Sequence, residues 1–167
     1  MIKIIAQDYY DTLIKLYTKL EKVDRALEVG LGWGTSAQAF LNTFENAKLD
    51  SIEQADYHGI FEEIQKMYGG RIEIIVGRSP EVYGSYAFPM YDYIYIDAAH
   101  DYEAVKLDVE NTWQYLKLGG IMAFDDYGVE GKTEEGLGHG VKKFVDEYFN
   151  NSVPIFLERN IIAFRKG

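Results

Sequence analysis

The fold is decided by one stretch of the chain, Glu28-Val29-Gly30-Leu31-Gly32-Trp33-Gly34. This stretch ends a short apolar run that begins at Arg25, and residues 35–44 behind it have the spacing of a helix. The sequence therefore predicts a strand, a tight turn and a helix. Glycines in such a turn let the backbone bend sharply and approach a ligand at the N-terminus of the next helix.

The same alternation of strand and helix continues along the chain. Further strands are expected at 48–53, 71–77, 91–97 and 121–124, and helices at 56–67, 102–116 and 141–149. Residues 153–157 and 161–164 have the length and composition of a β-hairpin. These elements predict an α/β fold, with a mostly parallel seven-stranded sheet, helices on both faces and an antiparallel hairpin at the C-terminal end.

Length and composition predict one domain. A chain of 167 residues that is 47% hydrophobic is long enough to bury one core and short for two. We divide it into an N-terminal helix, 1–24, and a cofactor-binding and catalytic core, 25–167. The N-terminal apolar stretch is too short for a signal peptide or a membrane span, so we expect a cytoplasmic protein without a membrane partner.

Charge and cysteine content exclude several kinds of chemistry. The formal net charge of -10 disfavours nucleic acid as a substrate, because an acidic surface repels phosphate. The chain has no cysteine, so it has no disulfide, no thiolate zinc site and no cysteine nucleophile. Nucleic acid is therefore not an expected partner.

Two segments have the position to cover a site. From Tyr10 to Leu20 the apolar residues follow helical spacing and predict an amphipathic helix, which is either a lid or plain packing. Residues 127–140 contain five glycines and no apolar periodicity, which predicts a mobile surface loop.

In an open parallel sheet, ligands bind beyond the carboxyl ends of the strands. The residues at those ends are Gly30 to Gly34, Glu53, Gly77-Arg78-Ser79, Asp97 to His100, and Asp125-Asp126. A dinucleotide fingerprint would need glycine at position 35, where this chain has Thr35. Glu53 ends the second predicted strand, from which an acid can accept both ribose hydroxyls of an adenosine ligand; a plain surface glutamate is the alternative.

Gly30-x-Gly32-x-Gly34, with Glu28 in the strand before it, resembles motif I of class I S-adenosylmethionine-dependent methyltransferases. Two further segments narrow the resemblance: Ile96-Asp97-Ala98-Ala99-His100 and Phe124-Asp125-Asp126-Tyr127. From about Arg25 to Phe149 the chain resembles the small-molecule O-methyltransferases grouped with macrocin O-methyltransferase. The resemblance implies a Rossmann-like methyltransferase fold and transfer of a methyl group to a hydroxyl of a sugar or natural product.

The resemblance also implies a set of site residues. The magnesium ligands would be Asp97, Asp125 and Asp126, and the catalytic base would be His100. The S-adenosylmethionine contacts would be Glu28, Gly30, Gly32, Gly34, Thr35, Glu53, Gly77, Arg78, Ser79 and Asp97.

The residues themselves support a metal, because three carboxylates at one sheet edge repel one another unless a cation or protons intervene. Oxygen ligands of this kind suit Mg²⁺ or Ca²⁺. The alternative for Asp125-Asp126 is helix capping or a turn, and the alternative for His100 is a structural histidine. His139, in the predicted loop, is the rival base.

Two departures from the family leave questions open. Arg78 stands where relatives commonly carry an acid or small polar residue that contacts adenine, so this contact is expected from Ser79 or from backbone. The N-terminal region is also short, so the acceptor pocket is either open or completed by another copy of the chain. The remaining alternatives are a nucleotide- or NAD-binding enzyme and a non-catalytic partner subunit that keeps the cofactor pocket.

Overall fold

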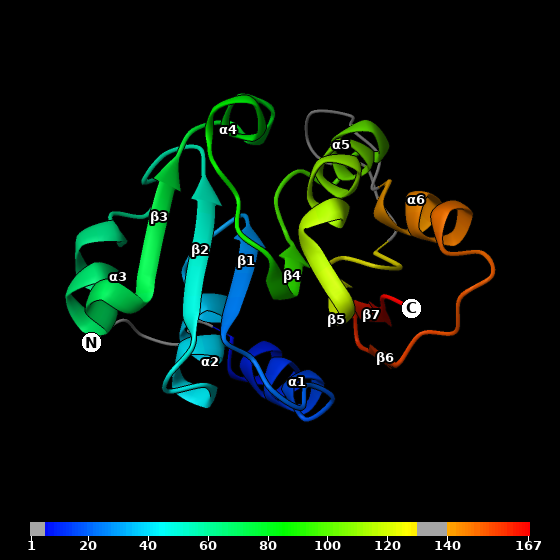
Figure 1. The fold of residues 1–167 in the computed structure, drawn as a ribbon, viewed down its shortest axis with the longest axis horizontal. Helices are drawn as coiled ribbons and strands as arrows, with labels where there is room; N and C mark the ends of the chain where they lie inside the picture. Colours follow the sequence, from blue (N-terminus) through cyan, green and yellow to red (C-terminus); the bar gives the residue numbers. More distant parts are fainter. Residues whose placement is uncertain (1–5, 130–139) are drawn as a thin grey trace.

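The computed structural model describes residues 6–129 and 140–167. Its centre is a seven-stranded sheet with the strand order β3-β2-β1-β4-β5-β7-β6 (Figure 1). The strands are β1 (Arg25–Val29), β2 (Lys48–Glu53), β3 (Ile72–Val76), β4 (Tyr91–Ile96), β5 (Leu116–Phe124), β6 (Phe156–Glu158) and β7 (Ile161–Arg165). The first five strands pair in parallel, and β7 pairs antiparallel with both β5 and β6. This is the predicted Rossmann-like methyltransferase fold.

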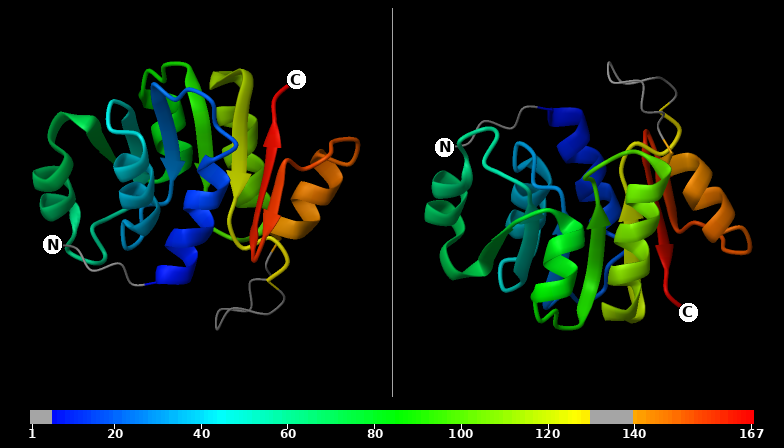
Figure 2. Two further views of the ribbon diagram at one scale, coloured as in Figure 1. Left: turned by 90° about the horizontal axis from the view of Figure 1, so that it is seen from below. Right: turned by 90° about the horizontal axis from the view of Figure 1, so that it is seen from above.

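Helices cover both faces of the sheet, as Figure 2 shows. The helices are α1 (Gln7–Tyr17), α2 (Thr35–Thr43), α3 (Phe61–Tyr68), α4 (Ser79–Ser85), α5 (Tyr102–Thr112) and α6 (Val141–Tyr148), with short 3₁₀ turns η1 (Gly69–Arg71) and η2 (Trp113–Tyr115). One apolar layer joins the sheet to α1, α2 and α3, and the other joins it to α4, α5 and α6. The strands, buried on both faces, accordingly read as near-continuous apolar runs.

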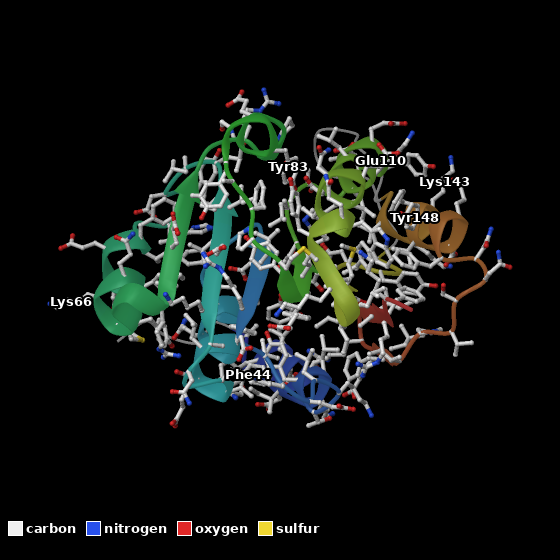
Figure 3. The ribbon with its side chains drawn as sticks, in the orientation of Figure 1. Phe44, Lys66, Tyr83, Glu110, Lys143 and Tyr148 are labelled. Carbon is white, nitrogen blue, oxygen red and sulfur yellow. The ribbon has the colours of Figure 1, made fainter. Side chains whose placement is uncertain are left out.

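Side chains from distant parts of the sequence meet in these two layers (Figure 3). On the first face, the ring of Tyr17 in α1 contacts Phe44 edge to face, with ring centres 5.6 Å apart. On the second face, Tyr83 lies between α4 and α5 and donates a hydrogen bond of 2.8 Å to Asp108. The N-terminal helix is therefore part of the packed domain.

The strand order reverses between β1 and β4, because the chain runs outward through β2 and β3 before it returns to β4 on the other side. At such a switch point the two crossover connections leave in opposite directions and open a crevice at the carboxyl ends of the strands. The glycine turn after β1 and the acid after β4 both lie at this crevice.

Several element boundaries differ from the sequence prediction. Helix α4 was not expected, and Pro80 lies in its first turn, where its missing N–H is tolerated. The helix expected from residue 56 begins only at Phe61, because Gly59 has a φ of 67° and the Asp56 carboxylate accepts the N–H of Ile60.

The remaining differences lie at the ends of α5 and in the last strands. Helix α5 ends at Thr112, and η2 leads directly into β5, which begins at Leu116 and runs through Gly119 and Gly120. The pairing of β4 with β5 shifts register there, between Tyr91 and Tyr93, which accommodates the glycines. Strand β6 begins after Pro154, which has no N–H to donate to a ladder.

Within the described residues no helix combines the length and apolarity that a bilayer crossing requires. Most of the predicted loop 127–140, including His139, lies outside the described residues.

Candidate active site

The glycine turn has the backbone geometry that its sequence predicts. Gly30, Gly32 and Gly34 have φ angles of 98°, 51° and 72°, which side chains with a Cβ rarely adopt. The N–H of Gly30 donates to the carbonyl of Ile52 at 2.9 Å, and that of Gly34 donates to Leu31 at 2.7 Å. Helix α2 begins directly behind the turn, at Thr35.

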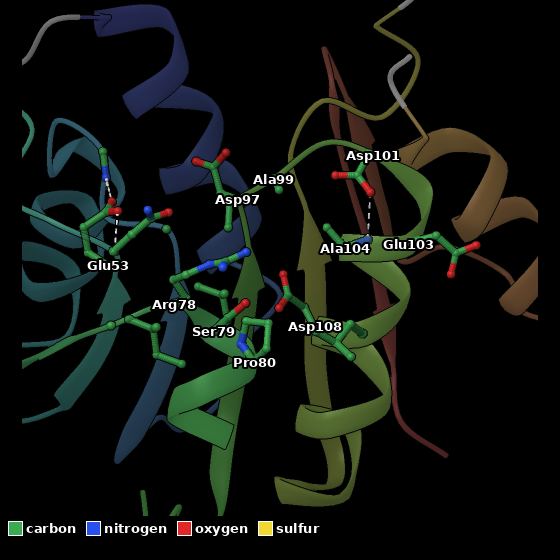
Figure 4. A pocket seen from close by; sticks show the side chains of 18 residues that line it. Glu53, Arg78, Ser79, Pro80, Asp97, Ala99, Asp101, Glu103, Ala104 and Asp108 are labelled. Carbon is green, nitrogen blue, oxygen red and sulfur yellow. Dashed lines mark hydrogen bonds between the residues drawn. The ribbon is translucent and has the colours of Figure 1, made fainter. Parts of the chain in front are cut away.

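A cavity of about 780 Å³ opens beside the turn (Figure 4). This volume lies within the range of sites for cofactors and small molecules. The cavity is lined by seven of the predicted site residues, namely Gly30, Gly32, Glu53, Gly77, Arg78, Ser79 and Asp97. Helix α5 closes one side of it with Ala104, Leu107 and Asp108.

Glu53 lies at the cavity and holds the glycine turn. Its Oε2 accepts the backbone N–H groups of Leu31 and Gly32, at 3.0 Å and 2.9 Å. Its Oε1 accepts the N–H of Gln54 at 2.7 Å. The carboxylate is thus fixed at the end of β2, and of its about four acceptor sites the backbone leaves about one, on Oε1, that can accept a ribose hydroxyl.

Glu28, a predicted cofactor contact, is not among the residues that line the cavity. Its side chain is buried, and it accepts hydrogen bonds from the hydroxyls of Ser36 in α2 and Ser51 in β2, the latter at 2.7 Å. Burial raises the pKa of Glu28 to about 7. Glu28 therefore links the end of β1 to α2 and β2.

Asp97 after β4 and Asp125 after β5 meet at the hydroxyl of Tyr9. Tyr9 Oη donates to Asp97 Oδ2 at 3.0 Å, interacts with Asp125, and lies 2.7 Å from Tyr95 Oη. Burial, followed by the charge of Asp125, raises the pKa of Asp97 well above its usual value. Burial also raises the pKa of Asp125 to about 6. Two such carboxyls favour a proton or a cation at this place.

Asp126 turns toward the histidine. It has a φ of 54°, and its Oδ2 pairs with Nδ1 of His100. This hydrogen bond is the main reason why the pKa of His100 is raised. In the part of the chain that the structure describes, no three His, Cys, Asp or Glu side chains are grouped to hold a metal ion. Of the three predicted metal ligands, the structure therefore brings together Asp97 and Asp125 but not Asp126.

A second hollow, of about 280 Å³, lies on the other side of the glycine turn. It is lined by Tyr9, Trp33, Thr35, Asp97 and Asp125, among others. Thr35 was expected at the cofactor and instead lies here. The indole of Trp33 stacks on His58 with ring centres 3.6 Å apart, which gives this side of the turn an aromatic wall.

Two residues of the site were missed by sequence reasoning. Tyr9 belongs to the N-terminal helix, and no sequence signal links it to Asp97. Asp108 carried a signal, because it lies among the buried positions Val105, Val109 and Thr112 of α5. A carboxylate on the apolar face of a helix needs a partner, and this one faces the cavity.

Comparison with known proteins agrees with this geometry. Residues 27–127 match the family model described as a methyltransferase domain. The chain belongs to this family. The match begins in β1 and ends just after Asp125 and Asp126, so it spans the glycine turn and all the strand ends described above. Its enzyme class is that of the S-adenosylmethionine-dependent methyltransferases.

Solved structures share the fold of this methyltransferase. A Staphylococcus aureus protein described as a caffeoyl-CoA O-methyltransferase has a TM-score of 0.76 at 20% identity, over 98% of this chain and 86% of that one. A Bacillus cereus O-methyltransferase in complex with SAH has a TM-score of 0.74 at 16% identity, over 97% and 82%. MycE of the mycinamycin pathway, in complex with Mg, SAH and mycinamycin VI, has a TM-score of 0.62 at 20% identity, over 96% and 49%. The comparison with curated proteins gave no match.

Proposed function

We propose that this methyltransferase transfers the sulfonium methyl group of S-adenosylmethionine to a hydroxyl oxygen of a small neutral or cationic acceptor, such as a sugar. The observation that carries the proposal is that the larger cavity and the smaller hollow lie next to each other and share lining residues. Both are lined by Gly32 and Asp97. A donor in the larger cavity and an acceptor in the smaller hollow would meet beside Asp97, and such proximity supplies much of the rate acceleration of a two-substrate reaction.

The chemistry of the acid pair fits a magnesium ion. Mg²⁺ is commonly held by one or two carboxylates and keeps several waters, so Asp97 and Asp125 suffice without Asp126. Bound there, the ion would supply Lewis-acid polarisation of the acceptor hydroxyl. Tyr9 would hold Asp97 in place from the side of α1.

His100 is the proposed base. Its Nδ1 pairs with Asp126, so the other ring nitrogen, Nε2, would take the proton of the acceptor hydroxyl. Asp126 would fix the orientation of the ring and stabilise the protonated form. A positioned base of this kind contributes typically ~10²–10⁴-fold to the rate.

The proposal is tested by incubating the protein with methyl-labelled S-adenosylmethionine and pools of small metabolites, with and without Mg²⁺. We expect label in a hydroxyl-bearing product. His100→Ala should lower its formation about 10²–10⁴-fold, whereas His139→Ala should leave it near the wild-type level. Label on nitrogen or carbon would contradict the proposed acceptor atom, and a slow His139→Ala with a normal His100→Ala would contradict the proposed base.

A further inference from the structure

A buried carboxyl on α5 has no part in the chemistry above. The side chain of Asp108 is 1% exposed in the ligand-free protein, yet it lines the cofactor cavity. Figure 4 shows its carboxyl turned toward Ser79, in the region where the loop after β3 meets α5. In the same view it lies apart from Asp97.

The partners of Asp108 leave part of its acceptor capacity unused. Tyr83 Oη donates to Oδ1 at 2.8 Å, and the hydroxyl of Ser79 faces the same carboxyl. An ionised carboxylate offers about four acceptor sites. The described groups that act on Asp108 are these two hydroxyls and the acid Asp101, none of them a cation. A buried carboxylate with so few donors is costly unless a ligand adds another.

Arg78, which follows β3, cannot accept a hydrogen bond from a ligand as Asp108 can. Arg78 lines the cavity, but a guanidinium has five N–H donors and no acceptor. The exocyclic amino group of adenine is a donor and needs an acceptor. The lining of the same cavity also includes apolar side chains that suit a flat base, among them Ile52, Ala98 and Leu107.

We propose that Asp108, held in place by Tyr83 and Ser79, accepts a hydrogen bond from the amino group of the cofactor's adenine and so determines the base specificity of this methyltransferase. The inference rests on the proposed placement of S-adenosylmethionine in this cavity. It assigns to helix α5 a recognition contact that the sequence led us to expect from Ser79 or backbone.

The test compares two ligands by calorimetry: S-adenosylhomocysteine and its analogue with unsubstituted purine as the base. The wild type should bind the adenine ligand roughly 10- to 100-fold more tightly, because the purine analogue leaves the buried carboxylate without its donor. Equal binding of the two ligands by the wild type would overturn the inference. Binding of neither would show that the cavity is not the cofactor site, and would contradict the proposed placement as well.

Two variants separate recognition from plain packing. Asp108→Ala removes both acceptor oxygens and should lose most of the preference, through weaker binding of S-adenosylhomocysteine, with the affinity for the purine analogue changed by no more than about twofold. Tyr83→Phe removes the hydrogen bond between Tyr83 in α4 and Asp108 in α5 but keeps the carboxylate of Asp108. This variant should therefore still prefer the adenine ligand to the purine analogue. If Asp108 is only structural, both variants will weaken both ligands in parallel, and the inference is wrong.

Discussion

A Cβ atom on Gly30 would lie 2.0 Å from the carbonyl oxygen of Asp97. The two residues end the neighbouring strands β1 and β4, so the sheet is closed at its switch point by contact between two backbones. Gly30 also has a φ of 98°. Only glycine tolerates both this close approach and this positive φ. The same residue lines the cavity beside the turn.

This contact predicts the effect of adding one methyl group. Gly30→Ala should lower the free energy of unfolding by about 2–5 kcal/mol, because backbone strain adds to a clash with backbone atoms that cannot move aside. The matched control is Gly32→Ala: its φ of 51° is also left-handed, but its Cβ would meet no atom within 4 Å. The control should lose only about 1–2 kcal/mol. Equal losses in urea denaturation would contradict the explanation.

The buried carboxyl of Glu28 predicts a pH dependence of stability. In the unfolded chain this group ionises near pH 4.5, whereas in the folded protein burial raises its pKa to about 7. The folded state therefore binds the extra proton, and this contribution to stability is present below pH 4.5 and is lost as the pH rises through about 7. The gap corresponds to about 3 kcal/mol.

Glu28→Gln isolates this contribution, because Asp97, Asp108 and Asp125 titrate in both proteins. The stability of the wild type relative to the variant should fall between pH 4.5 and pH 7, and then stay level. Chemical denaturation at a series of pH values measures it. A difference that does not change with pH would show that Glu28 is ionised in the folded protein.

The hydroxyl of Tyr9 predicts a specific loss of stability. Tyr9→Phe removes the donor to the buried carboxyl of Asp97 and should lower the free energy of unfolding by about 1–3 kcal/mol. Tyr10→Phe is the control on the same helix, since the Tyr10 hydroxyl accepts a long hydrogen bond of 3.3 Å from Asn42. That control should change stability by no more than about 0.5 kcal/mol. Similar losses for the two variants would argue against a role of Tyr9 at the acid pair.

Repulsion between Asp97 and Asp125 predicts that Asp125→Asn stabilises the metal-free protein but removes its stabilisation by magnesium. Without magnesium at pH 8, Asp125→Asn should stabilise the protein by about 1 kcal/mol or more, because it removes one of two neighbouring charges that are half-buried. Added Mg²⁺ should raise the melting temperature of the wild type, because a ligand that binds the folded state stabilises it. The melting temperature of Asp125→Asn should not change. Asp11→Asn, on the exposed side of α1, is the control that keeps the response. A magnesium-induced shift of equal size in Asp125→Asn would exclude this acid as a ligand.

Much of the fold was predictable, because strands buried on both faces leave apolar runs that end at their functional residues. Helix α4 was missed because it is short, and only Val82 in it is buried. The start of β5 was missed because two glycines normally interrupt a strand, whereas here a register shift against β4 absorbs them. Such adjustments depend on the partner strand and leave no local pattern.

The lining of the cavity was predictable where the strand ends determine it, as at Glu53 and Asp97. The side-chain directions were not. Glu28 and Asp126 are themselves predicted site residues, but their carboxyls turn to Ser36 and His100. Which neighbour satisfies a buried carboxyl depends on three-dimensional contacts, and the same is true of Tyr9, whose helix is far from Asp97 in the sequence.

The central claim is that the cavity beside the glycine turn binds S-adenosylmethionine through Glu53. Calorimetric titration with S-adenosylmethionine and with NAD tests it most directly. The titration compares the wild type with Glu53→Ala and with the control Glu62→Ala, at an exposed position of α3. We predict that the wild type and Glu62→Ala bind S-adenosylmethionine in preference to NAD, and that Glu53→Ala binds it roughly 10- to 100-fold more weakly, because charge-assisted hydrogen bonds to the ribose are lost. Tighter binding of NAD, or an unchanged affinity in Glu53→Ala, would contradict the account.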